Sequence, residues 1–97
     1  MELTIIDNSQ KKRFEALVEG HTAIIEYIRA KDGIIYLTHT EVPKELGGKG
    51  VGSALVKGVL ERIESEGLTL APLCPFVAAY LKRHPEWQRL LAKGYHV

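Results

Sequence analysis

Apolar and polar positions divide the chain into a strand-rich front part and a helix-rich remainder. β-Branched and aromatic residues gather in runs in the front part, which is typical of strands. The strands expected there are residues 13–18, 21–30 and 34–42, after a short apolar run at 3–6. Asp32-Gly33 between the last two segments predicts a β-hairpin, because both residue types tolerate the positive φ angles of a tight turn. Pro43 then ends the second strand of the hairpin, since it has no N–H to give to a ladder.

From residue 51 onward the apolar positions recur with helical spacing. They predict a helix that ends near Gly67, and its apolar positions are Val51, Ala54, Leu55, Val59, Leu60 and Ile63. The apolar segment 68–73 suits a short buried strand. A helical pattern resumes after Cys74-Pro75, and Pro85 opens a last short helix.

The middle of the chain therefore has the order strand, glycine-rich loop, helix, strand. A helix of this length between two short strands implies a parallel, right-handed βαβ unit. The N-terminal strands add an antiparallel meander, so the expected fold class is α/β, or α+β in a looser naming. With 97 residues and 45% hydrophobic content, the chain is expected to form one domain over residues 1–97.

Charge and cysteine content exclude several classes of function. A net charge of +1 provides no general attraction to nucleic acid or to anionic membranes, and the basic cluster at 11–13 lacks the interleaved aromatics of single-strand binders. No run of residues approaches the roughly 20 apolar positions of a membrane span. One cysteine and scattered histidines predict neither a disulfide nor a metal site.

The N-terminal segment has its charged and apolar residues in the wrong order for a signal peptide. We therefore expect a cytoplasmic protein without nucleic-acid, membrane or metal partners.

The topology predicts where a site lies. In a parallel βαβ unit the loop after the first strand and the residue after the second strand meet at one edge of the sheet, where open α/β sheets bind ligands. Here that edge collects Gly47–Ser53, with the sequence GGKGVGS, and Cys74.

The segment GGKGVGS has two interpretations: a loop that needs positive φ angles, or an anion site. Glycines let the backbone approach a ligand closely, and N–H groups at a helix start attract anions. The position of the segment between a strand and an amphipathic helix, with Lys49 beside it, favours the anion site. Two nucleotide motifs fail: Gly50 stands where a Walker loop needs Ser or Thr, and Ser53 stands where a dinucleotide fingerprint needs Gly or Ala.

The segment resembles the acyl-CoA loop of the GNAT acetyltransferases, which reads Gln or Arg, two residues, Gly, one residue, then Gly or Ala. Gly50-Val51-Gly52 matches its glycine end, whereas Gly47 stands where Gln or Arg is expected. More specifically, the chain resembles the small GNAT-like family of single-domain predicted N-acetyltransferases. The resemblance covers roughly residues 12–90 and includes the Arg13-Phe14 strand, THTEVPKELGGKGVGSALV and APLCPFVAAYLKRHPEW.

The resemblance implies a trimmed GNAT fold with antiparallel N-terminal strands, a βαβ core and C-terminal helices, without the full N-terminal helical region that shapes the acceptor site in larger relatives. It implies transfer of an acetyl group from acetyl-CoA to a primary amine of a small molecule or peptide. Pantetheine would pair with the strand end, chiefly Thr40 and Val42. Pyrophosphate would meet mainly the backbone N–H groups of Gly47, Gly48, Lys49, Gly50, Val51, Gly52 and Ser53.

Four side chains are candidates for the chemistry. Cys74 could accept the acetyl group covalently or only line the thioester pocket, and a lone cysteine is often just a small buried hydrophobe. His39 and Glu41 share a strand face by period two and could take a proton from the amine, or be an ordinary sheet residue and a rim charge. Tyr80 could protonate the leaving thiolate or belong to the core.

Two alternatives remain open at this point. A short chain without an acceptor region also suits a module that binds or senses CoA or acyl-CoA with little turnover. A homo-oligomer in which a neighbour completes the acceptor site is the other.

Overall fold

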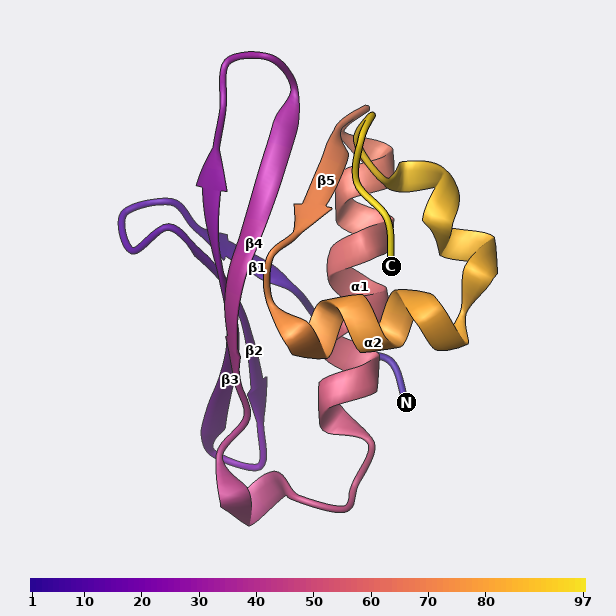
Figure 1. The fold of residues 1–97 in the computed structure, drawn as a ribbon. Helices are drawn as coiled ribbons and strands as arrows, with labels where there is room; N and C mark the ends of the chain where they lie inside the picture. The colour runs from indigo at the N-terminus through magenta and orange to yellow at the C-terminus, as the bar shows by residue number, and fades with distance from the viewer.

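The computed structural model describes residues 1–97 as a five-stranded sheet with its helices packed on one face (Figure 1). The order of the strands in the sheet is their order in the chain. The strands are β1 (Ile6–Asn8), β2 (Arg13–Val18), β3 (His21–Arg29), β4 (Ile34–Glu41) and β5 (Thr69–Pro72). The helices are α1 (Val51–Ser65) and α2 (Pro75–Arg83), with 3₁₀ helices η1 (Lys44–Leu46) and η2 (Pro85–Leu90).

The sheet is antiparallel from β1 to β4, and β4 pairs with β5 in parallel. The connection between β4 and β5 runs through η1 and α1, as the βαβ prediction requires. The mixed fold class expected from the sequence is thus confirmed. The last pair of the parallel ladder is Leu37–Pro72, although β4 continues to Glu41. The end of β4 therefore has no strand beside it on that edge.

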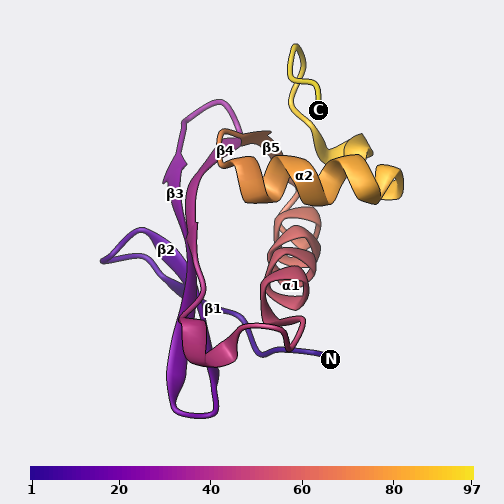
Figure 2. The same cartoon turned by 60° about the horizontal axis from the view of Figure 1, so that its bottom comes forward.

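A single hydrophobic core lies between the sheet and the helices. Alternate residues of β2 and β3 face it, and Phe14, Ile25 and Tyr27 are among them. The apolar stripe of α1 covers these side chains with Leu55, Val56, Val59, Leu60 and Ile63. Seen edge-on, the opposite face of β1–β4 carries no helix (Figure 2).

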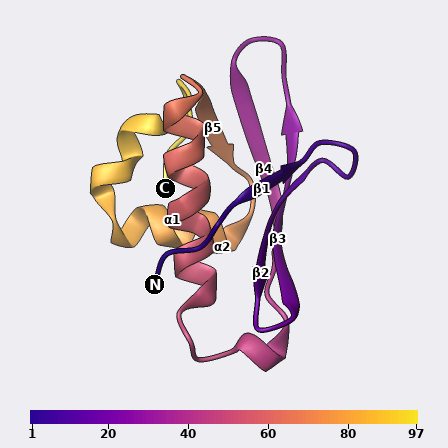
Figure 3. The same ribbon diagram turned by 180° about the vertical axis from the view of Figure 1, so that it is seen from behind.

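The short helix expected from Pro85 is confirmed, whereas the first apolar run joins the sheet only at its last residue. In the first run, strand pairing begins only at Ile6, and Leu3 and Ile5 pack against the core outside the sheet. Viewed from behind, this N-terminal segment crosses α1 (Figure 3). A Cβ on Gly58 would lie 2.7 Å from Cγ1 of Ile5, so this glycine inside α1 makes room for the crossing. The last short helix, Pro85–Leu90, is a 3₁₀ helix.

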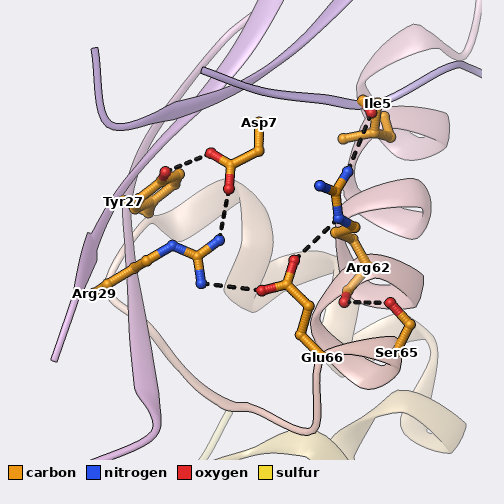
Figure 4. A network of polar contacts seen from close by, with 7 residues as sticks. All are labelled: Ile5, Asp7, Tyr27, Arg29, Arg62, Ser65 and Glu66. Atoms are coloured by element: carbon orange, nitrogen blue, oxygen red, sulfur yellow. Dashed lines mark hydrogen bonds and ion pairs between the residues drawn. The ribbon is translucent and has the colours of Figure 1, made fainter. Parts of the chain in front are cut away.

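A polar network holds the C-terminal end of α1 to the sheet (Figure 4). Arg29 lies at its centre, with its Nη2 2.7 Å from Oδ2 of Asp7 and its Nη1 3.2 Å from Oε1 of Glu66. Tyr27 donates its hydroxyl to Asp7, and Arg62 pairs with Glu66 at 3.0 Å. Burial and the bond to Asp7 raise the pKa of Tyr27. The network fixes the end of α1 that lies about 22 Å from the glycine-rich loop.

None of the helices is both long and apolar enough to cross a membrane. The structure also contains no group of three or more His, Cys, Asp or Glu side chains placed to hold a metal ion.

Candidate functional site

A β-bulge in β4 decides which side chains face the site. Tyr27 pairs with Leu37 but Glu26 pairs with His39, so Thr38 is an extra residue in the ladder. Its hydroxyl donates to the carbonyl oxygen of Glu26 at 3.3 Å. The bulge exchanges the two faces of β4, because inward positions are odd-numbered before it and even-numbered after it.

After the bulge, Thr40 faces inward opposite the buried Ile25. His39 and Glu41 face the open side of the sheet and are exposed. They share a strand face, as period two predicts. The apolar positions contain the signal for the bulge, since they change from Ile35 and Leu37 to Val42, but sequence reasoning did not use it.

Thr40 and Cys74 come together just beyond the last pair of the β4–β5 ladder, a place that we call the opening between β4 and β5. Just past the last pair of the ladder, the backbone N–H of Cys74 donates to the carbonyl oxygen of Leu37 at 2.9 Å. The Cys74 thiol donates to Oγ1 of Thr40 at 3.2 Å. Cys74 is the N-cap of α2 and is only 4% exposed. The structure therefore places this thiol at the point where the two strands separate.

The start of α1 presents a row of free backbone amides. The N–H groups from Gly48 to Ser53 have no acceptor within the chain, and the first helical bond joins Ala54 N to Gly50 O at 3.1 Å. No side chain caps this end, and no acidic residue lies in the first turn. Because unpaired amides and the helix dipole both favour negative charge, the row has the chemistry that an anion site needs.

The glycine-rich loop also contains residues with positive φ angles. Gly48 and Gly50 have φ angles of 75° and 76°, which favour glycine strongly. The positive-φ interpretation of GGKGVGS is therefore confirmed at Gly48 and Gly50, and the same turn leaves the amides free, as the anion-site interpretation requires.

Three residues of the expected loop have a structural role in addition to, or in place of, a free backbone N–H. The Gly47 N–H donates to the carbonyl oxygen of Lys44 at 2.9 Å, so it does not belong to the free row. The side chain of Val51 is buried in the core, so this residue offers only its backbone. A Cβ on Gly52 would lie 2.6 Å from Cζ of Phe76, so glycine here lets the ring pack against α1.

Lys49 is not a free positive charge at the loop. Its Nζ lies 2.7 Å from Oε1 of Glu19, in the turn between β2 and β3. The bond to Lys49 lowers the pKa of Glu19. Both side chains are exposed, so this is a surface ion pair that an incoming anion competes with.

Two hollows lie beside the glycine-rich segment. The first, of about 220 Å³, has its walls formed by Val42, Leu46, Phe76 and the loop itself, and we call it the loop hollow. The second, of about 370 Å³, contains Lys57, Tyr80 and His84, and we call it the helix hollow. Gly50 and Ser53 line both hollows, so they adjoin along the start of α1.

Tyr80 lies in the helix hollow and not beside Cys74. Its ring stacks on His84 with centroids 4.2 Å apart, and its hydroxyl has no hydrogen-bond partner in the chain. Burial, followed by the nearby carboxylates of Glu86 and Glu61, raises the pKa of Tyr80, so the hydroxyl stays protonated at neutral pH. The structure does not bring Tyr80 and Cys74 into one hollow.

A third hollow, of about 540 Å³, opens on the uncovered face of the sheet. We call it the face hollow, and its lining residues are Arg13, Thr22, Ile24, Glu41, Val42, Pro43 and Lys44. Val42 also lines the loop hollow, so the two hollows meet at the end of β4. His39 lines none of the three.

The parallel strands β4 and β5 end their pairing beside a helix that begins with glycines and free amides. This is the arrangement that the resemblance to the GNAT N-acetyltransferases implies. Comparison with known families gives the same class. The family model described as GCN5-related N-acetyl-transferase matches residues 13–90. The chain therefore belongs to the GCN5-related N-acetyltransferase family, and the resemblance seen in the sequence is confirmed.

Individual similar proteins share less than a third of their residues with this chain. Protein NATD1 of Mus musculus is 30% identical over 78 residues, which cover 78% of this chain and 71% of the relative. Protein NATD1 of Gallus gallus is 29% identical over 83 residues, covering 82% and 76%. A GCN5-like protein from Staphylococcus aureus, solved by NMR, superposes with a TM-score of 0.71 at 28% identity, covering 98% of this chain and 93% of that one.

Proposed function

We propose that this chain is an acetyl-CoA-dependent N-acetyltransferase that acetylates a primary amine of a small molecule or peptide. The row of free amides from Gly48 to Ser53, beside the opening between β4 and β5, is the observation that carries the proposal. Family membership supports acetyl transfer in general.

The pyrophosphate, the amide-containing arm and the thioester of acetyl-CoA match successive parts of the site. The amides at the start of α1 match the pyrophosphate, which needs several donors and a positive helix end. The edge of β4 beyond Leu37 has no strand beside it, so an arm with amide groups can pair there as an extra strand does. An arm on this path brings the thioester to Thr40 and Cys74.

Direct transfer needs one proton acceptor and one proton donor. The amine nitrogen forms a bond to the acetyl carbon, the carbon–sulfur bond breaks, and the proton from nitrogen is balanced by one delivered to the CoA sulfur. Glu41, on the open face, is the candidate acceptor. Tyr80, whose hydroxyl is protonated and unpartnered, is the candidate donor, and His39 is the alternative acceptor.

A covalent route through Cys74 is the alternative mechanism. The acetyl group would move first to Sγ and then to the amine, with CoA leaving in the first step. The thiol is buried and donates to Thr40, so this route requires that bond to break before the sulfur attacks. The direct route needs no such rearrangement.

The test combines binding with turnover. Calorimetric titration with acetyl-CoA should show one site per chain, and a panel of primary amines should release CoA thiol on one or more members. If acetyl-CoA produces no heat and no protection against thermal unfolding, the proposal is wrong.

A second candidate function is a module that binds CoA or acyl-CoA with little turnover. The separation of Tyr80 from Cys74 favours it, because the candidate acid lines the helix hollow and the thiol does not. This module would bind CoA tightly and acetylate none of the amines. A second copy that completes the acceptor site over the uncovered face is a further proposal, and sedimentation that shows only monomer would contradict it.

A further inference from the structure

The face hollow has no role in the binding of CoA as described above. It lies on the side of the sheet away from α1 and α2, and only Val42 connects it with the loop hollow. We propose that it binds the acceptor, and that the acceptor carries a primary amine at one end and a carboxylate at the other, separated by an apolar chain. This inference rests on the proposed function and names its substrate class.

Charges of both signs line this hollow, and Arg13 is the one that has a partner in the chain. Glu41 and Lys44 are exposed and form no ion pair or hydrogen bond through their side chains. Arg13 bonds Glu15 through Nε at 2.6 Å, which leaves its two NH₂ groups free. A ligand with one positive and one negative end can therefore pair with all three groups, whereas a simple amine leaves the two cations unused.

The spacing of the strands gives the length of the ligand. Glu41 on β4 pairs with Ile24 on β3, whose partner on β2 is Glu15, and Arg13 lies two residues along β2 from Glu15. Two strand spacings of about 10 Å across the sheet and two residues of about 7 Å along it separate the backbones of Arg13 and Glu41 by about 12 Å. This distance corresponds to a chain of about five methylene groups after allowing for the reach of the two side chains. The side chain of Ile24 is 6% exposed and provides an apolar floor for such a chain.

The bulge at Thr38 orients this ligand for reaction. Because it turns Glu41 outward and Thr40 inward, the amine end at Glu41 is one residue away from the Thr40–Cys74 contact. The acceptor and the thioester thus approach the end of β4 from opposite faces. The carboxylate end points away from the opening, toward Arg13 and Lys44.

The test uses ¹⁵N-labelled protein saturated with CoA. Titration with 6-aminohexanoate should shift the amides of Thr22, Ile24 and Glu41. The matched probes 6-aminohexanamide and hexylamine, which lack the carboxylate, should bind about tenfold more weakly or worse. Lys44→Gln should remove most of this difference, and Lys31→Gln, an exposed lysine in the hairpin turn, should leave it unchanged. Arg13→Gln is a second variant, and its fold is checked by its spectrum.

The outcomes separate the two proposals. If CoA fails to shift the amides of Gly48–Ser53, the proposed function is wrong, and the aminohexanoate titration of the free protein still judges the face hollow. If all three probes bind with equal Kd, shift other residues, or shift nothing, the acceptor proposal is overturned. A thiol-release assay should show the same preference for the free acid over its amide in kcat/KM.

Discussion

A charged side chain at Gly50 should abolish the binding of CoA without unfolding the protein. In Gly50→Glu, the carboxylate lies at the uncapped start of α1. There it can accept hydrogen bonds from the free amides and repel an incoming anion. The new Cβ meets nothing within 4 Å, so packing is not disturbed. The remaining cost is the φ angle of 76°, which for a residue other than glycine is about 1–2 kcal/mol.

The chain contains a matched control for this strain. Gly33, in the β3–β4 hairpin, has a φ angle of 83° and is equally open around its Cβ. Gly33→Glu should therefore lose a similar amount of stability, which a domain with about 5–15 kcal/mol of total stability tolerates. It should keep its affinity for CoA, because it lies outside the loop.

The expected loss of affinity follows from the hydrogen bonds. A hydrogen bond from an amide to a charged oxygen contributes about 1.5–3 kcal/mol. If pyrophosphate uses only two of the amides between Gly48 and Ser53, their loss corresponds to about 3–6 kcal/mol, or roughly a hundredfold to ten-thousandfold in Kd. Gly50→Ala, which adds strain without charge, should lie between wild type and Gly50→Glu.

The assay is calorimetric titration of CoA into the three variants and wild type, with thermal melts to compare their stability. If Gly50→Glu binds CoA as tightly as wild type does, the assignment of the loop as the anion site is refuted. Equal loss in both would show that strain, and not the site, controls binding.

Three further predictions concern the thiol, the polar network and the crossing of α1. Direct transfer predicts that Cys74→Ser keeps its turnover of acetyl-CoA within a few-fold of wild type. It also predicts that mass spectrometry finds no acetyl adduct on the wild-type protein after incubation with acetyl-CoA. An adduct on wild type that Cys74→Ala lacks would establish the covalent route. Because the pKa of Tyr27 is raised in the folded state, its contribution to stability is present below about pH 10 and is lost as the pH rises through the folded pKa. Urea unfolding should show a smaller alkaline loss for Tyr27→Phe than for wild type, and equal losses would contradict this. Gly58→Ala should lower the melting temperature, because its Cβ displaces Ile5. In an Ile5→Ala background the same substitution should raise the melting temperature, because alanine has the higher helix propensity. A change of the same sign in both backgrounds would contradict this prediction.

The sequence supported most of the fold because its signals are local. The spacing of apolar residues identifies α1, Asp32-Gly33 identifies the hairpin, and Pro43 ends β4. From these elements, the helix-length connection between two strands predicts the parallel pair, and the shared edge of that pair places Cys74 near the loop. The signal failed at the N-terminus, where the same apolar run suits a strand or a segment packed on a helix, and α1 provided the partner for Leu3 and Ile5.

The candidate site was predicted less completely. The glycine-rich segment and its helix could be located, but the ion pair between Lys49 and Glu19 joins residues 30 positions apart and has no signature in either segment. Gly52 reads as a loop glycine in sequence and serves to accommodate Phe76 in the structure. Tyr80 could be assigned to the helix after Cys74, but not to one of two adjoining hollows.

By itself, the sequence determined where a row of free backbone amides lies, because free amides at a helix start depend only on the loop and the helix that follows it. The tertiary structure alone decided which side chains meet there. The insertion of Thr38 into the β3–β4 ladder depends on the register of a partner strand, and it sends Thr40 toward Cys74 and Glu41 to the open face. Side-chain direction on a strand reverses with each residue, so a one-residue bulge sets the two sides of the site.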